Sequence, residues 1–442
     1  LQTLGCPKNQ VDSDKLEGRL VAQGYARAAS AAEADLVVVN TCAFIEPARQ
    51  ESIDTVLELA DVRRDGARLV VTGCMAERYG DELAAALPEV DLVAGFGQEL
   101  TGVPVSLTSK SKTPAGNGFD LLELPRPAAE VPWAYIKVAE GCDRICGFCA
   151  IPSFRGPQRS RSMDEIMREV DQLAEGGVTP SGESAPPLRE IVLVAQDLAS
   201  YGRDRSVPGQ RASAGASPIA ALTRAVSARV DRTRLLYLYP SGLTDELIEA
   251  VLSTGVPYFD LSLQHVSRPH LTRMRRWGDG ERFLRRMEAI RSAAPDATFR
   301  SSFILGYPGE TERDHDLLLE FLAEAQLDWA GFFLYSSEDG TYAATQPDAV
   351  PAELALQRLR ECTEVQDVIT ATRRDALIGQ HLEVLVDTPR VGRSVHEAPE
   401  IDGVVRLDAP ATPGTFVRVE ITGAEGPDLF GSLVSTAVGA RR

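Results

Sequence analysis

The chain has 442 residues, a formal net charge of −18, and ordinary fractions of hydrophobic (44%) and charged (25%) residues. This length predicts about two to four domains, and the acidic balance excludes nucleic-acid binding by bulk charge, so strong RNA contact would need a local basic patch. The sequence shows no signal peptide and no apolar run near the ~18 residues of a membrane span, so we expect no membrane association.

The N-terminal segment, residues 1–103, alternates strand and helix patterns. Strands are expected at 1–5, 35–40, 68–72 and 90–94, and helices at 12–24, 53–60 and 77–87. The middle helix shows the i, i+3, i+4, i+7 stripe of an amphipathic helix in Ile53, Val56, Leu57 and Ala60. This alternation predicts an open parallel sheet in an α/β domain. Because Leu1 already lies in an expected strand, we expect the N-terminus to be shortened.

Cys6, Cys42 and Cys74 each follow the carboxyl end of an expected strand. In an open parallel sheet these ends share one edge, where ligands bind, so the three thiols should converge. The alternative is three buried structural cysteines. The seven cysteines form two sets of three, with Cys362 alone and interpreted as structural, which does not indicate a disulfide framework. Reduced thiols favour a cytoplasmic protein.

Residues 104–130 lack periodicity and are interpreted as a linker. From residue 131 to 358 strand and helix patterns alternate again, with strands expected at 133–138, 189–195, 234–239, 258–263, 298–305 and 329–335. Such repeated units predict a partial (β/α)6 barrel whose site lies at the carboxyl-end loops. Two stretches rich in Gly, Ser and Pro, at 176–187 and 202–217, are interpreted as loop insertions.

The first expected barrel strand leads into a loop that carries Cys142, Cys146 and Cys149. The C-x3-C-x2-C spacing folds a short loop around one small cofactor. Three thiolates, rather than the usual four of a structural zinc or an ordinary iron–sulfur cluster, leave a coordination position open for a ligand. The alternative is a zinc knuckle with a distant fourth ligand.

The C-terminal part begins with a connecting helix at 359–376, which continues an amphipathic pattern from 351. Residues 377–442 then form short β runs separated by Gly and Pro, which predicts a small antiparallel β-barrel.

The cysteine loop resembles that of the radical S-adenosylmethionine (SAM) enzymes, and the whole arrangement resembles their methylthiotransferase family. That family has an N-terminal cluster domain, a radical SAM barrel and a C-terminal TRAM barrel. Its tRNA branch (MiaB-like) modifies an adenosine, and its ribosomal branch (RimO-like) modifies an aspartate of small-subunit protein S twelve. Gly-Cys-Pro-Lys-Asn at 5–9, Asn-Thr-Cys-Ala-Phe-Ile at 40–45 and Ile-Pro-Ser-Phe-Arg-Gly at 151–156 resemble the RimO-like branch.

The resemblance implies that each cysteine set holds a 4Fe-4S cluster. The cluster on Cys142, Cys146 and Cys149 would bind SAM and form a 5′-deoxyadenosyl radical, and the auxiliary cluster on Cys6, Cys42 and Cys74 would carry sulfur. An electron donor is then required, and no catalytic side chain is expected beyond the cofactors. Further cofactor-binding candidates, each weighed against plain packing or capping, are Phe148, Gln196, Asp197, Gln264, Arg300 and Gly306.

Charged residues suggest two contact regions. The basic run Arg155, Arg159 and Arg161 is either solvated surface or a contact for SAM or an acidic substrate. Residues 373–442 contain eight Arg, no Lys and ten acidic residues, a net of −2, which disfavours RNA and suits a basic ribosomal protein. We therefore expect docking of that protein on Glu397, Glu400 and Asp402, against the alternative of a solvated acidic loop.

Three other functions remain open from the sequence. They are a MiaB-like tRNA methylthiotransferase, an iron–sulfur electron-transfer protein and an RNA-binding zinc protein. An electron carrier would explain both cysteine sets but not the barrel and the terminal β-barrel. Iron and sulfide analysis would separate the zinc protein from the others.

Overall fold

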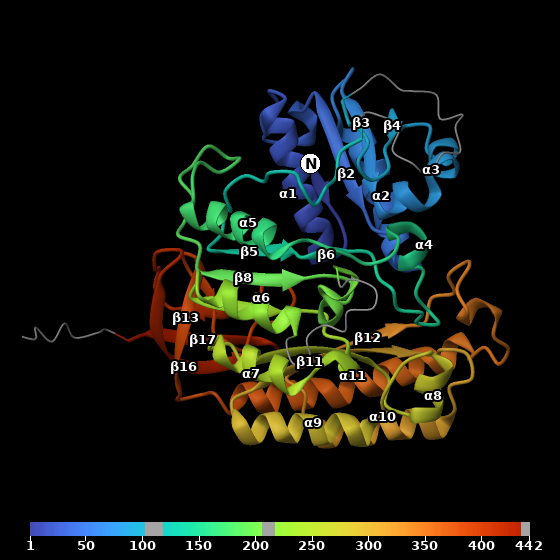
Figure 1. Ribbon diagram of the computed structural model, residues 1–442, viewed down its shortest axis with the longest axis vertical. Helices are drawn as coiled ribbons and strands as arrows, with labels where there is room; N and C mark the ends of the chain where they lie inside the picture. The colour runs from blue at the N-terminus through green and yellow to red at the C-terminus, as the bar shows by residue number, and fades with distance from the viewer. Residues whose placement is uncertain (102–117, 206–216, 435–442) are drawn as a thin grey trace, which may run out of the picture.

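The computed structural model describes residues 1–101, 118–205 and 217–434 (Figure 1). Parts of the expected linker (104–117), of the second loop insertion (206–216) and of the C-terminal segment (435–442) lie outside the described residues. Within the described part, no helix is long and apolar enough to cross a membrane.

The N-terminal domain is built on the expected open parallel sheet, with strand order β1-β2-β3-β4. Buried residues run through β2 and β3 and form the domain core with Val37, Val39, Leu69 and Val71. The strands are β1 (Gln2–Thr3), β2 (Leu36–Thr41), β3 (Arg68–Gly73) and β4 (Leu92–Val93), and the helices are α1 (Pro7–Ala22), η1 (Ala31–Glu33), α2 (Glu46–Val62) and α3 (Cys74–Ala86).

The central domain is the expected partial barrel. Its parallel strands form the sheets β5-β8-β9 and β10-β11-β12, which a parallel bridge between Leu238 and Leu261 joins. A short antiparallel pair, β6 (Ala139–Glu140) and β7 (Arg159–Ser160), flanks the cysteine loop. The barrel strands are β5 (Trp133–Lys137), β8 (Glu190–Val194), β9 (Arg232–Leu235), β10 (Tyr258–Gln264), β11 (Thr298–Leu305) and β12 (Trp329–Leu334).

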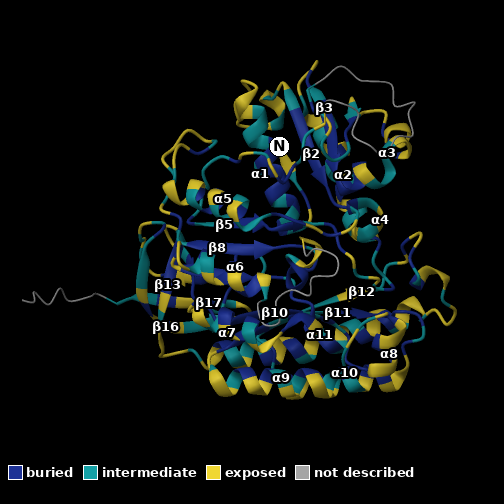
Figure 2. Cartoon of the chain, in the orientation of Figure 1, coloured by how far each residue is buried: buried dark blue, intermediate teal, exposed yellow. Residues whose placement is uncertain are grey.

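Helices cover the outside of this barrel. Figure 2 shows buried strands inside and exposed residues on the outer sides of the helices. The helices of this part of the chain are α4 (Ile151–Arg155), α5 (Met163–Glu175), η2 (Leu198–Ser200), η3 (Arg203–Arg205), α6 (Pro218–Ser227), η4 (Pro240–Gly242), α7 (Asp245–Ser253), α8 (Arg268–Arg273), α9 (Gly280–Ala293), α10 (Glu312–Ala325), η5 (Ala343–Thr345) and α11 (Ala352–Asp375). Of these, α4 packs against α3 of the N-terminal domain.

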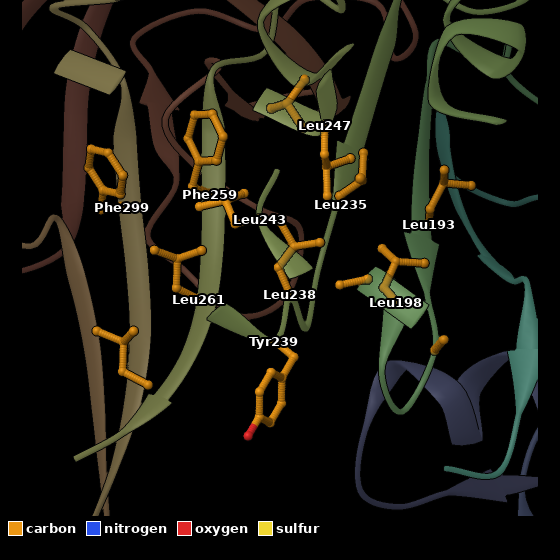
Figure 3. Close-up of a cluster of buried hydrophobic side chains, with 14 of the residues drawn as sticks. Leu193, Leu198, Leu235, Leu238, Tyr239, Leu243, Leu247, Phe259, Leu261 and Phe299 are labelled. Carbon is orange, nitrogen blue, oxygen red and sulfur yellow. The ribbon is translucent and has the colours of Figure 1, made fainter. Parts of the chain in front are cut away.

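Apolar side chains between strands and helices form the largest core cluster. Figure 3 shows Leu193, Leu235 and Phe259 lying on neighbouring barrel strands, with Leu247 of α7 against them. The rings of Phe259 and Phe299 stack with centroids 5.6 Å apart. Each such side chain contributes about 1.5–3 kcal/mol through burial, so this packing fixes the strand ends that carry the candidate site.

The C-terminal domain is a closed barrel with strand order β13-β14-β15-β17-β16. It differs from the all-antiparallel expectation because β15 and β17 pair in parallel. Strand β17 pairs with β15 on one side and forms a hairpin with β16 on the other. The chain that leaves β15 must therefore pass the position of β17 before it forms β16. The strands are β13 (His381–Thr388), β14 (Val391–Arg393), β15 (Val405–Leu407), β16 (Phe416–Glu425) and β17 (Asp428–Leu433).

The loop between β14 and β15, residues 394–402, packs into the amino end of the central barrel. Ala398 is fully buried in a cluster with Tyr135 and Tyr258, the third residue of β5 and the first of β10. The Tyr135 hydroxyl donates a hydrogen bond to the Pro399 carbonyl at 2.8 Å. This loop is therefore a plug that joins the two barrels rather than a free surface.

This packing corrects the docking expectation for Glu397 and Asp402. The Glu397 side chain is 0% exposed, pairs with Arg374 and accepts hydrogen bonds from Ser394. The Asp402 carboxylate, 1% exposed, accepts from the Tyr258 hydroxyl at 2.6 Å. Neither carboxylate can face another protein, and of the three only Glu400 is exposed.

Candidate functional site

The cysteines of the first set meet at the carboxyl edge of the N-terminal sheet, which confirms their expected convergence. Cys6 is the N-cap of α1, Cys42 follows β2, and Cys74 begins α3. Burial raises the pKa of the Cys42 thiol to about 12, and the nearby Cys6 and Cys74 add to that shift. Gly5, at φ +93°, is required there because a Cβ would lie 2.8 Å from the Cβ of Cys42.

The second set lies in a tightly held loop after β6. The Gly147 N–H donates to the Met274 carbonyl at 2.8 Å, and the Gly147 carbonyl accepts from the Ala343 N–H at 2.7 Å. The Cys142 sulfur accepts the Arg144 N–H at 3.4 Å. Burial raises the pKa of Cys142 to about 11 and that of Cys149 to about 12. Residues from two distant segments, at Met274 and Ala343, therefore hold the loop in place.

The donor chemistry of both cysteine sets, three free thiols in each, suits an iron–sulfur cluster. All the cysteines are free thiols, and among the described residues no three His, Cys, Asp or Glu side chains are placed to share one metal ion. A 4Fe-4S cluster binds each cysteine to a different iron, so its ligands need not converge on a point. Guanidinium groups face a sulfur in each set, as suits anionic ligands.

Arg155 links the first set to the strand that enters the second. Its guanidinium donates to the Cys74 sulfur at 3.0 Å from Nη2 and 3.3 Å from Nε. The Nη1 atom donates to the Glu140 carboxylate at 2.8 Å, and Nη2 to the Asn9 side chain at 2.8 Å. The side chain is 2% exposed. Arg155 is thus a buried residue and not part of a solvated surface.

Glu140 and Lys137 complete this buried network. Although burial favours the protonated acid, Arg155 and Lys137 hold the pKa of the Glu140 carboxyl well below its usual range. The Lys137 ammonium, 0% exposed, pairs with both Glu140 and Asp12. The ion pairs cross from α1 to the barrel and hold the two cysteine loops together. Sequence reasoning missed Asp12, Lys137 and Glu140, although Glu140 directly precedes the Gly141-Cys142 turn.

Arg276 makes the corresponding contact with a cysteine sulfur of the second set. Its Nη1 donates to the Cys146 sulfur at 3.1 Å, and its Nη2 donates to the Ser262 carbonyl. The guanidinium also lies over the Tyr239 ring, 4.3 Å from the centroid. Arg276 stands 130 positions from Cys146, so no sequence motif could have connected them.

Gln196 and Asp197 lie directly beyond the carboxyl end of β8, beside the second cysteine loop. Gln196 donates to the Glu140 carboxylate at 2.9 Å, and the Asp197 carboxylate accepts from Arg144 at 2.6 Å. One buried side-chain oxygen of each, Gln196 Oε1 and Asp197 Oδ1, has no hydrogen-bond partner. These oxygens are free to accept hydrogen bonds from a ligand.

The remaining cofactor candidates lie in different parts of the barrel. Gln264 ends β10 with φ +69°, beside a register shift, a strained geometry that is common at functional sites. Phe148 packs half-buried on the barrel core. Gly306 follows β11, where a Cβ would meet Ala355 at 2.7 Å, so helix packing alone already requires this glycine.

Arg300 lies apart from these groups. It is the third residue of β11 and pairs with Asp260 at 3.4 Å and Asp402 at 3.3 Å. Gly306 follows Arg300 six positions later in the chain, which is about 20 Å along an extended strand. Of the partners of Arg300, Asp260 belongs to barrel strand β10, and Asp402 belongs to the plug at 394–402.

Arg159 and Arg161 line a separate cleft of about 580 Å³ between α5 and residues 122–126. Arg161 pairs with Glu169 at 2.7 Å, and Arg159 pairs with Asp120. The basic run predicted from sequence therefore divides, with Arg155 at the cysteines and the other two residues in this cleft.

Comparison with known proteins gives matches along the chain. Residues 1–95 match the uncharacterized protein family UPF0004, residues 136–322 the radical SAM superfamily, and residues 378–434 the TRAM domain. Curated relatives named ribosomal protein uS12 methylthiotransferase RimO include those from Myxococcus xanthus (40% identical; 98% of this chain and 91% of the relative), Moorella thermoacetica (40%; 95% and 95%) and Desulforudis audaxviator (42%; 99% and 97%).

Proposed function

The chain belongs to the family of ribosomal protein uS12 methylthiotransferases, and we propose that it adds a methylthio group to the β-carbon of an aspartate in uS12. One observation carries the proposal beyond the similarity. Two sets of three free thiols lie at facing loops of adjacent domains and share a buried network through Arg155 and Glu140. A methylthiotransferase needs a radical-forming centre and a sulfur-carrying centre close together.

The cofactors of this family are SAM and a 4Fe-4S cluster, and we assign the cluster to Cys142, Cys146 and Cys149. A second 4Fe-4S cluster on Cys6, Cys42 and Cys74 is part of the proposal. When bound, the cofactors supply the one-electron and radical chemistry that protein side chains cannot perform. The protein contributes six thiolate ligands, orientation of the substrates and exclusion of water.

The residues around the second cysteine loop would orient SAM. The unpaired oxygens of Gln196 and Asp197 point to recognition of a group with N–H donors, such as the amino group of SAM. Arg144 holds the Asp197 carboxylate at 2.6 Å and lies over the Tyr239 ring. Phe148 remains a proposed contact for the adenine ring of SAM. Gln264 remains a proposed contact for SAM at the end of β10.

The partners in the proposal are uS12 and an electron donor. A ribosomal substrate places the reaction in the cytoplasm. The net charge of −18 supports binding of a basic protein rather than of tRNA. Since the Glu397 and Asp402 side chains are buried, only Glu400 of these three residues can contribute to a docking surface.

Mass spectrometry of uS12 from cells with and without the gene tests this function. We expect the aspartate peptide to carry one methylthio group in place of hydrogen only when the gene is present. Nucleosides of tRNA from the same cells serve as the control. A methylthio group that depends on the gene in tRNA, with uS12 unmodified, would assign the chain to the tRNA activity instead.

A further inference from the structure

We infer that Arg155 and Arg276 set the reduction potentials of the two clusters separately, each through hydrogen bonding to one ligand sulfur. The inference rests on the proposed cluster sites at the two cysteine sets. Each arginine contacts one set: Arg155 contacts Cys74, and Arg276 contacts Cys146. Neither residue belongs to a cysteine motif.

Arg155 is held so that its guanidinium cannot turn away from the sulfur. Two of its nitrogens approach Cys74 Sγ, at 3.0 and 3.3 Å, while Asn9 and Glu140 accept from the terminal nitrogens at 2.8 Å each. The Phe96 ring lies 4.6 Å from its central carbon. A buried, preoriented cation at this distance acts in a low-dielectric environment, where its field is weakly screened.

Arg276 is fixed in a similar way but in a different electrostatic setting. Its Nη1 lies 3.1 Å from Cys146 Sγ, and its other contacts are the Ser262 carbonyl and the Tyr239 ring. Arg155, by contrast, also pairs with Glu140 and lies 3.4 Å from the Asp12 carboxylate. Loss of Arg155 would leave Asp12 and Glu140 with Lys137 as their remaining cationic partner. The described hydrogen bonds of Arg276, by contrast, include no acidic side chain.

Hydrogen bonds to cluster sulfurs and nearby positive charge favour the reduced, more negative cluster and so raise its reduction potential. Removing Arg155 should therefore lower the potential of the first cluster and leave the second unchanged. Removing Arg276 should do the reverse. The shift at the first cluster should be the larger, because Asp12, whose negative charge acts on Cys74, would lose one of its two cationic partners.

The test uses full-length reconstituted protein in two backgrounds. The Cys142/Cys146/Cys149→Ala protein isolates the first cluster, and the Cys6/Cys42/Cys74→Ala protein isolates the second. Arg155→Met and Arg276→Met are introduced into each, and redox titration followed by electron paramagnetic resonance gives the potentials. We expect a negative shift for Arg155→Met only in the first background and for Arg276→Met only in the second.

Lysine variants provide a second test in case a methionine variant does not fold. Arg155→Lys and Arg276→Lys keep the charge but lose the planar fork that reaches the sulfur, so each should give a smaller shift of the same sign at its own cluster. If Arg155→Met fails to fold, Arg155→Lys decides the question. Unchanged potentials at full iron content, or equal shifts of both clusters by one arginine, would overturn the inference. A first background that binds no iron would instead refute the proposed auxiliary cluster.

Discussion

Cys6 shows how a single position can favour a thiolate ligand. Burial raises its pKa, but Lys8, Arg155 and the backbone N–H groups of Asn9 and Lys8 outweigh burial, so the pKa of the Cys6 thiol lies below its ordinary value. The start of a helix supplies such N–H groups without any special residue. Cys74 is the first residue of α3 and receives a hydrogen bond from Arg155, but burial outweighs that contact and raises the pKa of its thiol.

Iron content is the first test at the residue scale. Two 4Fe-4S clusters give about eight irons per chain, and replacing Cys142, Cys146 and Cys149 by Ala should leave about four. Iron and acid-labile sulfide are measured after anaerobic reconstitution, with Cys362→Ala as the matched control that should keep all the iron. Full iron content in the triple variant would show that these thiols are not ligands.

Loss of the first cysteine set should not prevent radical formation at the second. The Cys6/Cys42/Cys74→Ala protein retains the loop that is proposed to bind SAM, so under reducing conditions it should still cleave SAM to 5′-deoxyadenosine. It should form no methylthio product, because the sulfur-carrying centre is lost. Chromatography of both products from one reaction gives the answer. A folded variant that no longer cleaves SAM would contradict this division of roles.

Among the structural elements, the plug between β14 and β15 has a stabilising role that can be measured. Glu397→Ala leaves the buried Arg374 without its partner, and breaking such a pair costs about 3–5 kcal/mol. The exposed neighbour Glu400 is the matched control, since surface substitutions usually change stability by about 0.5 kcal/mol or less. Urea unfolding followed by tryptophan fluorescence reports on this junction, because Trp329 donates to the His396 carbonyl at 2.9 Å. Equal unfolding midpoints for the two variants would contradict the plug.

The same ion pair predicts a pH dependence. Burial opposes ionisation of Glu397, but Arg374 and the Ser394 hydrogen bond lower the pKa of its carboxyl from 4.5 to about 2. A folded-state pKa below the unfolded value stabilises the protein above about pH 4.5, and this contribution is lost as pH falls toward 2. Glu397→Gln should therefore flatten the acid side of the stability profile, as urea midpoints between pH 5 and about pH 3 would show. An unchanged slope of stability against pH would show that the Glu397 carboxylate does not contribute to the loss of stability in acid.

Periodic patterns predicted the elements, while contacts between distant residues escaped prediction. Strand and helix alternation led to the parallel sheet, the barrel and the meeting of Cys6, Cys42 and Cys74, because chain topology alone brings strand ends together. The approach of Arg276 to Cys146 has no local signature. The acidic plug at 394–402 was expected to lie on the surface, because the sequence shows the charges of Glu397 and Asp402 but not their partners Arg374 and Arg300. Its apolar Val395, Ala398 and Ile401 were the signal that it packs inward.

At the scale of the whole molecule, buried ion pairs join the three domains. Lys137 and Arg155 connect the N-terminal domain to the barrel, while Arg393 connects the barrel to the C-terminal domain through Glu190 at 2.7 Å. These groups are nearly inaccessible to solvent, so the pairs are weakly screened and fix the relative orientation of the cysteine loops. The proposed chemistry depends on that orientation, since both centres must reach the same substrate carbon.

The most direct test of the proposed activity is a competition assay with purified enzyme. Reconstituted protein is given SAM, a reductant, a sulfur source and equal amounts of uS12 and tRNA, and both substrates are analysed by mass spectrometry. Modification of the uS12 aspartate, absent with either triple cysteine variant, is the predicted result. Modification of tRNA with unmodified uS12 would contradict the account.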